Sequence, residues 1–244
     1  MGGVRRPRRW ASWYLPGRLY DLAFGRMFAG LRRRVLRTVE RDGLYPWLDL
    51  CCGTGSQLRG GVKDHVGAGS VAAGQESARA GLAVGLDKSL GFVRYAAARA
   101  PGVPFVCADA AALPFRDGAF RAVSVSFALH EKDPGTRRLM MAEVRRVLAR
   151  GGRFVAVDFE PPWDGRSRAG TLATRAVERL AGGEHYRNGR DFLRRGGLRA
   201  VLRESGFAEV ARRDVAAGSL AVVTAELAET GGLMPVPRSP GNGE

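Results

Sequence analysis

WLDLCCGTG, residues 47–55, joins a short apolar run to a turn that contains two glycines. Such a run is typical of a β-strand that is buried on both faces of a parallel sheet. Gly53 and Gly55 let the backbone pass close to a ligand, because neither residue has a Cβ. Open α/β sheets bind their ligands at the carboxyl ends of the strands, so this turn is the first candidate for a binding site.

Strands and helices alternate along the chain after this turn. Asp133 can cap a helix whose first position is Pro134. This alternation predicts right-handed βαβ units and a parallel sheet. We expect further strands at 83–86, 104–107, 122–127 and 153–159, and helices at 89–100 and 137–149.

The C-terminal part of the chain has a different pattern. A helix is predicted at 191–204, and a β-hairpin follows it with strands at 208–215 and 219–225. Residues 229–244 contain three prolines and four glycines, which predicts a disordered tail. The predicted fold is therefore α/β, a Rossmann-like doubly wound sheet of seven strands. It is mostly parallel and ends in a C-terminal antiparallel hairpin.

The first 44 residues are basic and amphipathic. Residues 1–42 hold eleven arginines against three acidic residues, and apolar positions between 20 and 40 recur at steps of three and four. We expect a helix there that acts as a lid rather than as part of the sheet core. Its basic face has three possible interpretations: it is a solvated surface, it contacts an anionic membrane surface, or it contacts nucleic acid. Aromatic side chains would line the lid: Trp10, Trp13, Tyr14, Tyr20, Phe24 and Phe28.

The connection between Gly55 and Asp87 is unusually long. It comprises residues 56–86, which is 31 residues, whereas one crossover helix needs roughly 15–20. Its part at about 60–81 is rich in Ala, Gly and Ser and predicts an inserted loop. The predicted organisation is thus a lid at 1–44, one α/β domain at 45–228 and the tail.

Composition excludes several classes of protein. No apolar run approaches the ~18 residues of a membrane span, and no apolar stretch follows the basic start as in a secretory signal. Three cysteines cannot build a disulfide framework, so we expect a cytoplasmic protein or one peripheral to the membrane. The histidines, His65, His130 and His185, are too scattered in sequence for a ligand set, so no metal site is expected.

Polar residues also stand at the ends of the later strands. Asp87 ends the second strand, where a carboxylate can accept both hydroxyls of a ribose. Asp109 follows the third strand and is placed to accept from an adenine amino group, and Ser126 with Phe127 ends the fourth. These strand ends line one edge of the predicted sheet, so they predict a site for a ligand that contains a nucleoside.

Four motifs support this prediction in order: LDLCCGTG (48–55), GLDKS (85–89), ADAAALPFRDGAF (108–120) and EVRRVLARGGRF (143–154). With them the chain resembles the class I S-adenosylmethionine-dependent methyltransferases, in the small-molecule branch that includes the ubiquinone and menaquinone C-methyltransferases. In two places the chain departs from that family: Cys51 replaces the first glycine of the loop, and Arg121 stands where Asp is frequent.

The resemblance implies S-adenosyl-L-methionine as cofactor. Its methionine part would lie at the loop 49–55, its ribose at Asp87, and its adenine at Asp109 and the Ala110 backbone. The cofactor-binding residues that the resemblance implies are Asp49, Cys51, Gly53, Thr54, Gly55, Asp87, Lys88, Asp109, Ala110, Ser126 and Phe127.

Methyl transfer to a hydroxyl or to an acidic carbon needs a base. The catalytic candidates are His130, beside Glu131 just after the fourth strand, and His185 with Tyr186 after the fifth. A histidine has an ordinary pKa of about 6.5, which suits proton transfer at neutral pH. The predicted function is in-line methyl transfer to a small lipophilic or aromatic acceptor. An RNA or protein methyltransferase and a non-catalytic cofactor-binding protein are the alternatives.

Overall fold

The computed structural model describes residues 17–25, 27–63, 82–161 and 183–228. Several sequence predictions lie outside these ranges: the aromatic residues Trp10, Trp13 and Tyr14, most of the inserted loop, and the tail at 229–244. The side chains of Tyr20 and Phe24 are not described either. The contribution of these residues to a lid therefore stays a prediction.

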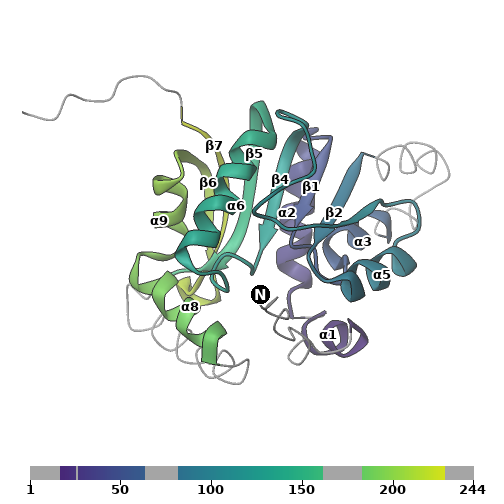
Figure 1. The fold of residues 1–244 in the computed structure, drawn as a ribbon, viewed down its shortest axis with the longest axis horizontal. Coiled ribbons are helices and arrows are strands. Elements are labelled where there is room, and N and C mark those ends of the chain that lie inside the picture. Colours follow the sequence, from purple (N-terminus) through teal and green to yellow (C-terminus); the bar gives the residue numbers. More distant parts are fainter. Residues whose placement is uncertain (1–16, 26, 64–81, 162–182, 229–244) are drawn as a thin grey trace, which may run out of the picture.

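Seven strands form one sheet in the order β3-β2-β1-β4-β5-β7-β6 (Figure 1). β1 to β5 run parallel, and β7 is antiparallel to both β5 and β6. The predicted fold is therefore confirmed, and the strand order reverses between β1 and β4. The strands are β1 (Trp47–Leu50), β2 (Ala83–Asp87), β3 (Phe105–Cys107), β4 (Phe120–Ser126), β5 (Leu148–Phe159), β6 (Phe207–Val215) and β7 (Leu220–Leu227).

Helices cover both faces of the sheet (Figure 1). On one face Met140, Phe192 and Leu198 join the apolar core, and on the other face Val35 and Leu58 pack in a second cluster. None of the helices in the described ranges has both the length and the apolar composition that crossing a membrane requires. The helices are α1 (Gly17–Phe24), α2 (Ala29–Arg41), α3 (Ser56–Lys63), α5 (Leu90–Arg99), α6 (Pro134–Val147), α8 (Gly183–Arg194) and α9 (Gly197–Glu204).

The N-terminal segment differs from its prediction in two ways. The single helix expected between 20 and 40 is divided into α1 and α2 near Gly25, where a Cβ would lie 2.1 Å from the Asp21 carbonyl oxygen. Val35 and Val39 of α2 are fully buried and pack in one cluster with Trp47 of β1. The expectation that this helix is a lid and not part of the core is therefore wrong for α2, because α2 shields one face of the sheet.

Two further boundaries differ from the sequence predictions. The helix expected at 191–204 is two helices, because Gly196 and Gly197 adopt φ values of 105° and 65°, which end α8 and redirect the chain. β5 begins at Leu148 rather than at 153, and its register with β4 shifts between Phe120 and Ala122. The C-terminal hairpin is present as predicted, with the short 3-10 helix η1 (Ala216–Gly218) at its turn.

Candidate functional site

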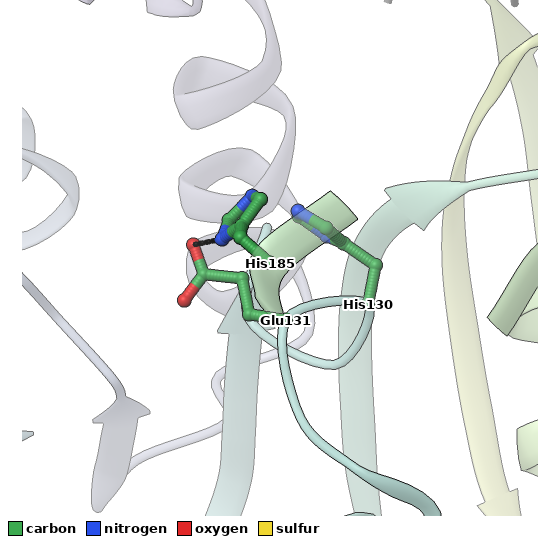
Figure 2. Close-up of side chains that lie close together, drawn as sticks. All are labelled: His130, Glu131 and His185. Atoms are coloured by element: carbon green, nitrogen blue, oxygen red, sulfur yellow. Dashed lines mark ion pairs between the residues drawn. The ribbon is translucent and has the colours of Figure 1, made fainter. Parts of the chain in front are cut away.

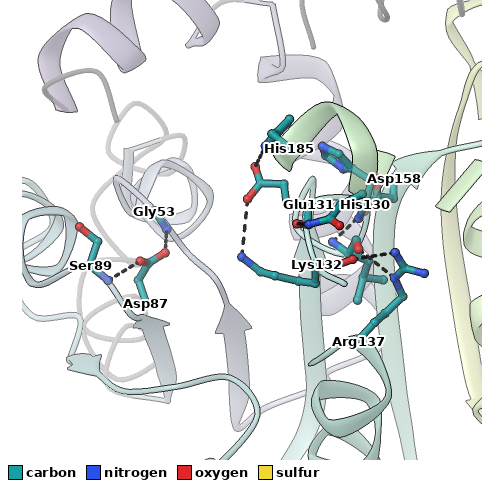
Figure 3. A network of polar contacts seen from close by, with 11 residues as sticks. Gly53, Asp87, Ser89, His130, Glu131, Lys132, Arg137, Asp158 and His185 are labelled. Carbon is teal, nitrogen blue, oxygen red and sulfur yellow. Dashed lines mark hydrogen bonds and ion pairs between the residues drawn. The ribbon is translucent and has the colours of Figure 1, made fainter. Parts of the chain in front are cut away.

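The loop after β1 is held in place by the carboxylate at the end of β2. Asp87 Oδ2 accepts a hydrogen bond of 2.8 Å from the Gly53 backbone N–H, and Asp87 Oδ1 accepts one of 2.8 Å from Ser89 (Figure 3). A carboxylate offers about four acceptor positions, so these two bonds leave capacity for ligand hydroxyls. Asp87 therefore has a role that the sequence did not reveal: it fixes the loop, although it does not line the cavity that opens beside this loop.

Cys51 adopts a left-handed conformation with φ 58°. This is the position where the resembled family has a glycine, and a residue with a side chain costs roughly 1–2 kcal/mol in such a conformation. Burial raises the pKa of the Cys51 thiol to about 12. The thiol is therefore protonated at neutral pH, so Cys51 contributes loop geometry rather than a nucleophile.

The loop is also fastened to the first helix. Asp21 of α1 accepts a hydrogen bond of 2.7 Å from the Thr54 hydroxyl at Oδ1, and its Oδ2 lies 2.7 Å from a guanidinium nitrogen of Arg59 on α3. The Tyr95 hydroxyl on α5 donates a further bond of 3.2 Å to Asp21 Oδ2. One carboxylate thus joins α1 to the loop and to two neighbouring helices.

A cavity of about 80 Å³ opens beside this loop. It lies at the carboxyl ends of β1 and β4, where the strand order reverses and where such sheets bind ligands. Six of the residues predicted to bind cofactor line it, and the sequence analysis missed the contributions of α2 and α3. The lining residues are Phe28, Leu31, Arg32, Asp49, Cys51, Cys52, Gly53, Thr54, Ser56, Gln57, Ser126 and Phe127.

Two buried polar atoms in this lining have no hydrogen-bond partner within the described ranges. They are Gln57 Oε1 and Ser126 Oγ. A buried polar atom without a partner costs about 1–3 kcal/mol, so such atoms are rare unless a ligand or water meets them. The cavity therefore fits a ligand with polar groups of its own.

Asp49 lies at the base of the cavity and is almost completely buried. Its Oδ1 accepts a hydrogen bond of 2.6 Å from the Ser124 hydroxyl, and that hydroxyl accepts one of 2.8 Å from Trp47 Nε1. Burial raises the pKa of Asp49 to about 7, against the effect of the Ser124 hydrogen bond. A cationic ligand group in the cavity would favour the ionised carboxylate.

The second predicted acidic position lies at the end of β3. Asp109 Oδ2 is 2.7 Å from Lys88 Nζ, and Asp109 Oδ1 accepts a hydrogen bond of 3.0 Å from Ala111 N–H. The hydrogen bond from Lys88 lowers the pKa of Asp109, so this carboxylate is ionised at neutral pH. Asp109 and Lys88 lie together where β2 and β3 end, but they do not line the cavity, so their cofactor role stays a prediction.

On the other side of the β4 end, the structure brings two histidines together (Figure 2). The rings of His130 and His185 are 5.4 Å apart between centroids, and His185 Nδ1 is 3.9 Å from Glu131 Oε1. One ligand-type atom from each of these three residues lies within 4.8 Å of the others. The expectation that the histidines are too scattered to meet is wrong for this pair, because α8 carries His185 to the loop after β4.

Tyr186, the third catalytic candidate, is also on α8. The guanidinium of Arg190 lies 5.8 Å from the centroid of its ring. His65 lies outside the described residues. The structure therefore groups His130, Glu131 and His185 and places Tyr186 against a different neighbour.

A buried aspartate that the sequence analysis missed lies behind His130. Asp158 of β5 is fully buried, and its Oδ1 is 2.7 Å from His130 Nδ1 (Figure 3). The residue stands within the apolar run of β5, so only its unusual burial as a carboxylate could have marked it. The geometry gives an imidazole with one nitrogen held by a carboxylate.

Comparison with known proteins agrees with this geometry. The family described as "Methyltransferase domain" matches residues 65–156. The demethylmenaquinone methyltransferase of Streptomyces griseus is 31% identical over 202 residues, which are 78% of this chain and 80% of that protein. That of Beutenbergia cavernae is 35% identical over 151 residues, and the match covers 60% of this chain but only 56% of the relative.

A solved structure shows the same fold at low sequence identity. The N-methyltransferase NodS from Bradyrhizobium japonicum, in complex with S-adenosylhomocysteine, is 13% identical with a TM-score of 0.52, covering 81% of this chain and 85% of that one. The sequence relatives thus point to the same class of protein as the strand order of the described sheet and the loop after β1. The chain therefore belongs to the class I S-adenosylmethionine-dependent methyltransferases, in the group related to the quinone methyltransferases.

Proposed function

We propose that this methyltransferase acts on a small, lipophilic, aromatic acceptor of the quinol type. One observation carries the proposal: a row of aromatic rings runs from the cofactor cavity to the histidine pair. The Phe28 and Phe127 rings are tilted against each other with centroids 4.4 Å apart. Phe127 is 6.0 Å from Phe159, and Phe159 is 4.5 Å from His130. A flat aromatic acceptor has complementary surfaces on such rings.

The relatives support this acceptor class. Both relatives described above are named demethylmenaquinone methyltransferases, and one of them matches over 80% of its own length. A quinol presents a ring carbon beside a hydroxyl, so it has an apolar face and an oxygen. The phenylalanine row would contact the face, and the polar cluster at His130 would receive the oxygen.

Bound S-adenosylmethionine supplies a methyl group on a positively charged sulfur. We propose that the residues around the cavity hold its methionine part, with Gln57 and Ser126 providing the two buried polar atoms and Asp49 facing its cationic groups. Asp87 would accept the ribose hydroxyls, and Asp109 with Lys88 would border the adenine. Their main contribution is to hold donor and acceptor at reacting distance, which is worth up to about 7–11 kcal/mol.

A lipophilic acceptor also suggests where the protein meets it. Exposed apolar side chains on and beside α1 are Leu19, Leu22 and Met27, of which Leu22 is 79% exposed. Exposed arginines on α1 and α2, among them Arg18 and Arg33, carry positive charge near them. We propose that this surface contacts an anionic bilayer, because apolar insertion and basic charge both favour such binding.

The test is methyl transfer from isotopically labelled S-adenosylmethionine. The purified protein would be offered a reduced short-chain demethylmenaquinol, bulk RNA and denatured protein in separate reactions. We expect label only in the organic extract of the quinol reaction. Label in RNA or protein would overturn the proposed acceptor. Cofactor binding by calorimetry with no label in any acceptor would favour the non-catalytic alternative.

A further inference from the structure

We propose that Asp158 is a positioning residue that makes His130 the proton acceptor of the methyl transfer. The inference rests on the proposed function for its reaction, but the pairing of the two side chains stands on geometry alone. It goes beyond the sequence prediction, which named His130 without any partner.

Asp158 uses its two oxygens on one short stretch of chain. Oδ1 is 2.7 Å from His130 Nδ1 and accepts a hydrogen bond of 2.8 Å from Phe159 N–H. Oδ2 accepts hydrogen bonds of 3.0 Å and 3.3 Å from the backbone N–H groups of Leu129 and His130. The carboxylate therefore fixes both the backbone and the ring of His130.

This arrangement selects one form of the imidazole. Both oxygens of Asp158 already accept hydrogen bonds from backbone N–H groups, so we assign the proton of the Nδ1 contact to the ring. The neutral ring then has its lone pair on Nε2. The ring is 3% exposed and is bordered edge-on by Phe159 and by Phe192, whose centroid is 6.4 Å away. Its orientation is thus set by a hydrogen bond on one side and by aromatic rings on others.

We place the acceptor at the Nε2 edge of the His130 ring. His185 lies edge-on to it, and the row of phenylalanines leads from it to the cofactor cavity. A base must come within hydrogen-bond reach of the proton that it removes. A quinol lying on Phe127 and Phe159 would have its hydroxyl at this edge.

Charged groups from each adjoining element surround the pair. Asp158 belongs to β5, while Glu131 and Lys132 lie in the loop after β4, with Lys132 Nζ 3.6 Å from Glu131 Oε2. Arg137 of α6 donates 3.0 Å from Nε to the Leu129 carbonyl oxygen, and its pKa is lowered by burial, against the effects of Asp191 and Asp158. His185 of α8 lies beside the His130 ring, and Arg137 is itself within the electrostatic reach of Asp191, Arg195 and Asp133. The charges nearly balance, so a proton gained by His130 is stabilised chiefly by Asp158.

The step balances as follows. The acceptor's electron pair forms a bond to the methyl carbon, and the carbon–sulfur bond breaks with its electrons passing to sulfur. The acceptor's hydroxyl proton passes to His130 Nε2, and the resulting imidazolium is stabilised by the Asp158 carboxylate. Where a ring carbon of a quinol takes the methyl group, the first product is the keto tautomer, and transfer of its ring C–H proton to the oxygen restores the aromatic quinol. His130 returns its proton to solvent after the product leaves, so no oxidant or reductant is needed.

The experiment compares Asp158→Asn, His130→Ala and the double variant, with Asp117→Asn at an exposed position as the matched control. We expect each single variant to lose about 10²–10⁴-fold in kcat with little change in KM, and the double variant to lose no more than either alone, because the two side chains act as a unit. We expect kcat of the parent to rise with pH, because a base must be unprotonated to act. This rise should be absent in His130→Ala and shifted to lower pH in Asp158→Asn, where the imidazolium loses its negative neighbour.

Two further measurements test the Asp158–His130 pairing itself. The first distinguishes it from a loss of folded protein, and the second does not depend on which acceptor is methylated. S-adenosylhomocysteine affinity should stay within about threefold in both variants, because neither side chain lines the cofactor cavity. Proton NMR of the parent should show a strongly deshielded imidazole N–H that both variants lose. Losses of kcat that multiply in the double variant, or native turnover in Asp158→Asn, would overturn the proposal.

A cation at His130, Glu131 and His185 is the competing explanation. Activity that a chelator abolishes and zinc or cobalt restores would therefore also overturn a base role for His130. If no acceptor is methylated at all, the proposed function fails, while the N–H resonance still shows whether Asp158 holds His130.

Discussion

Replacing Asp49 by Asn should make the unliganded protein more stable at alkaline pH. The pKa of this carboxyl is raised from 3.8 to about 7, chiefly by burial. Between those two pH values the folded chain binds a proton that the unfolded chain has released. The free energy of unfolding therefore falls as pH rises from about 4 to 7, and this contribution is constant above 7.

The size of the effect follows from the same two values. At 1.36 kcal/mol per pKa unit, the difference between 3.8 and about 7 corresponds to about 4 kcal/mol at pH 8. An asparagine keeps an oxygen that can accept the 2.6 Å hydrogen bond from Ser124, but it does not ionise. Asp49→Asn should therefore exceed the parent's free energy of unfolding by about 1.6 kcal/mol at pH 5, and by up to about 4 kcal/mol at pH 8.

Urea unfolding followed by circular dichroism at pH 5, 6, 7 and 8 would measure this. Asp133→Asn is a control of opposite sign, because hydrogen bonds from Thr136 and Gly135 lower the pKa of Asp133. That aspartate is ionised in both states from pH 5 to 8, so Asp133→Asn should be less stable than the parent by a constant amount across this series. A constant difference between Asp49→Asn and the parent across the series would refute the reasoning.

Three further outcomes are expected. Asp87→Ala should weaken S-adenosylhomocysteine binding at least tenfold by calorimetry, because its carboxylate braces Gly53 and is the one proposed to accept the ribose hydroxyls; unchanged affinity would remove Asp87 from the site. Leu22→Glu should reduce co-sedimentation of the protein with anionic vesicles. Leu139→Glu, at a position 58% exposed on α6, should not, and an equal loss of vesicle binding in both variants would exclude α1 as the contact. Deleting residues 1–28 should leave a folded chain by circular dichroism, but deletion through 41 should unfold it, since Val35 is fully buried; a folded longer truncation would restore the lid interpretation.

The loop beside the cavity and the acidic residues at the ends of β2 and β3 were predictable because their signals are local. The strand, the turn and the glycines of residues 47–55 are contiguous, and Asp87 and Asp109 follow strands with clear apolar patterns. The acceptor side was not, because it depends on contacts between distant segments. His185 reaches His130 only through the position of α8. Asp158 is visible in the sequence as the one acidic residue of β5, but its contact with His130 depends on how the loop after β4 packs. The division of the N-terminal helix was missed for another reason. Its apolar periodicity continues across Gly25, although the helical backbone is interrupted there.

The carboxylate of Asp21 has a thermodynamic consequence for the proposed membrane surface. It connects α1, which carries the exposed Leu22, to the Thr54 hydroxyl of the cofactor loop. If a bilayer binds one arrangement of α1 better than another, this hydrogen bond would couple that preference to the conformation of the loop. Reciprocity then requires that the cofactor change the affinity for the bilayer by the same factor as the bilayer changes the affinity for the cofactor. Through this one hydrogen bond of 2.7 Å, binding of a lipid surface would change the affinity for a soluble nucleoside, and binding of the nucleoside would change the affinity for the lipid surface.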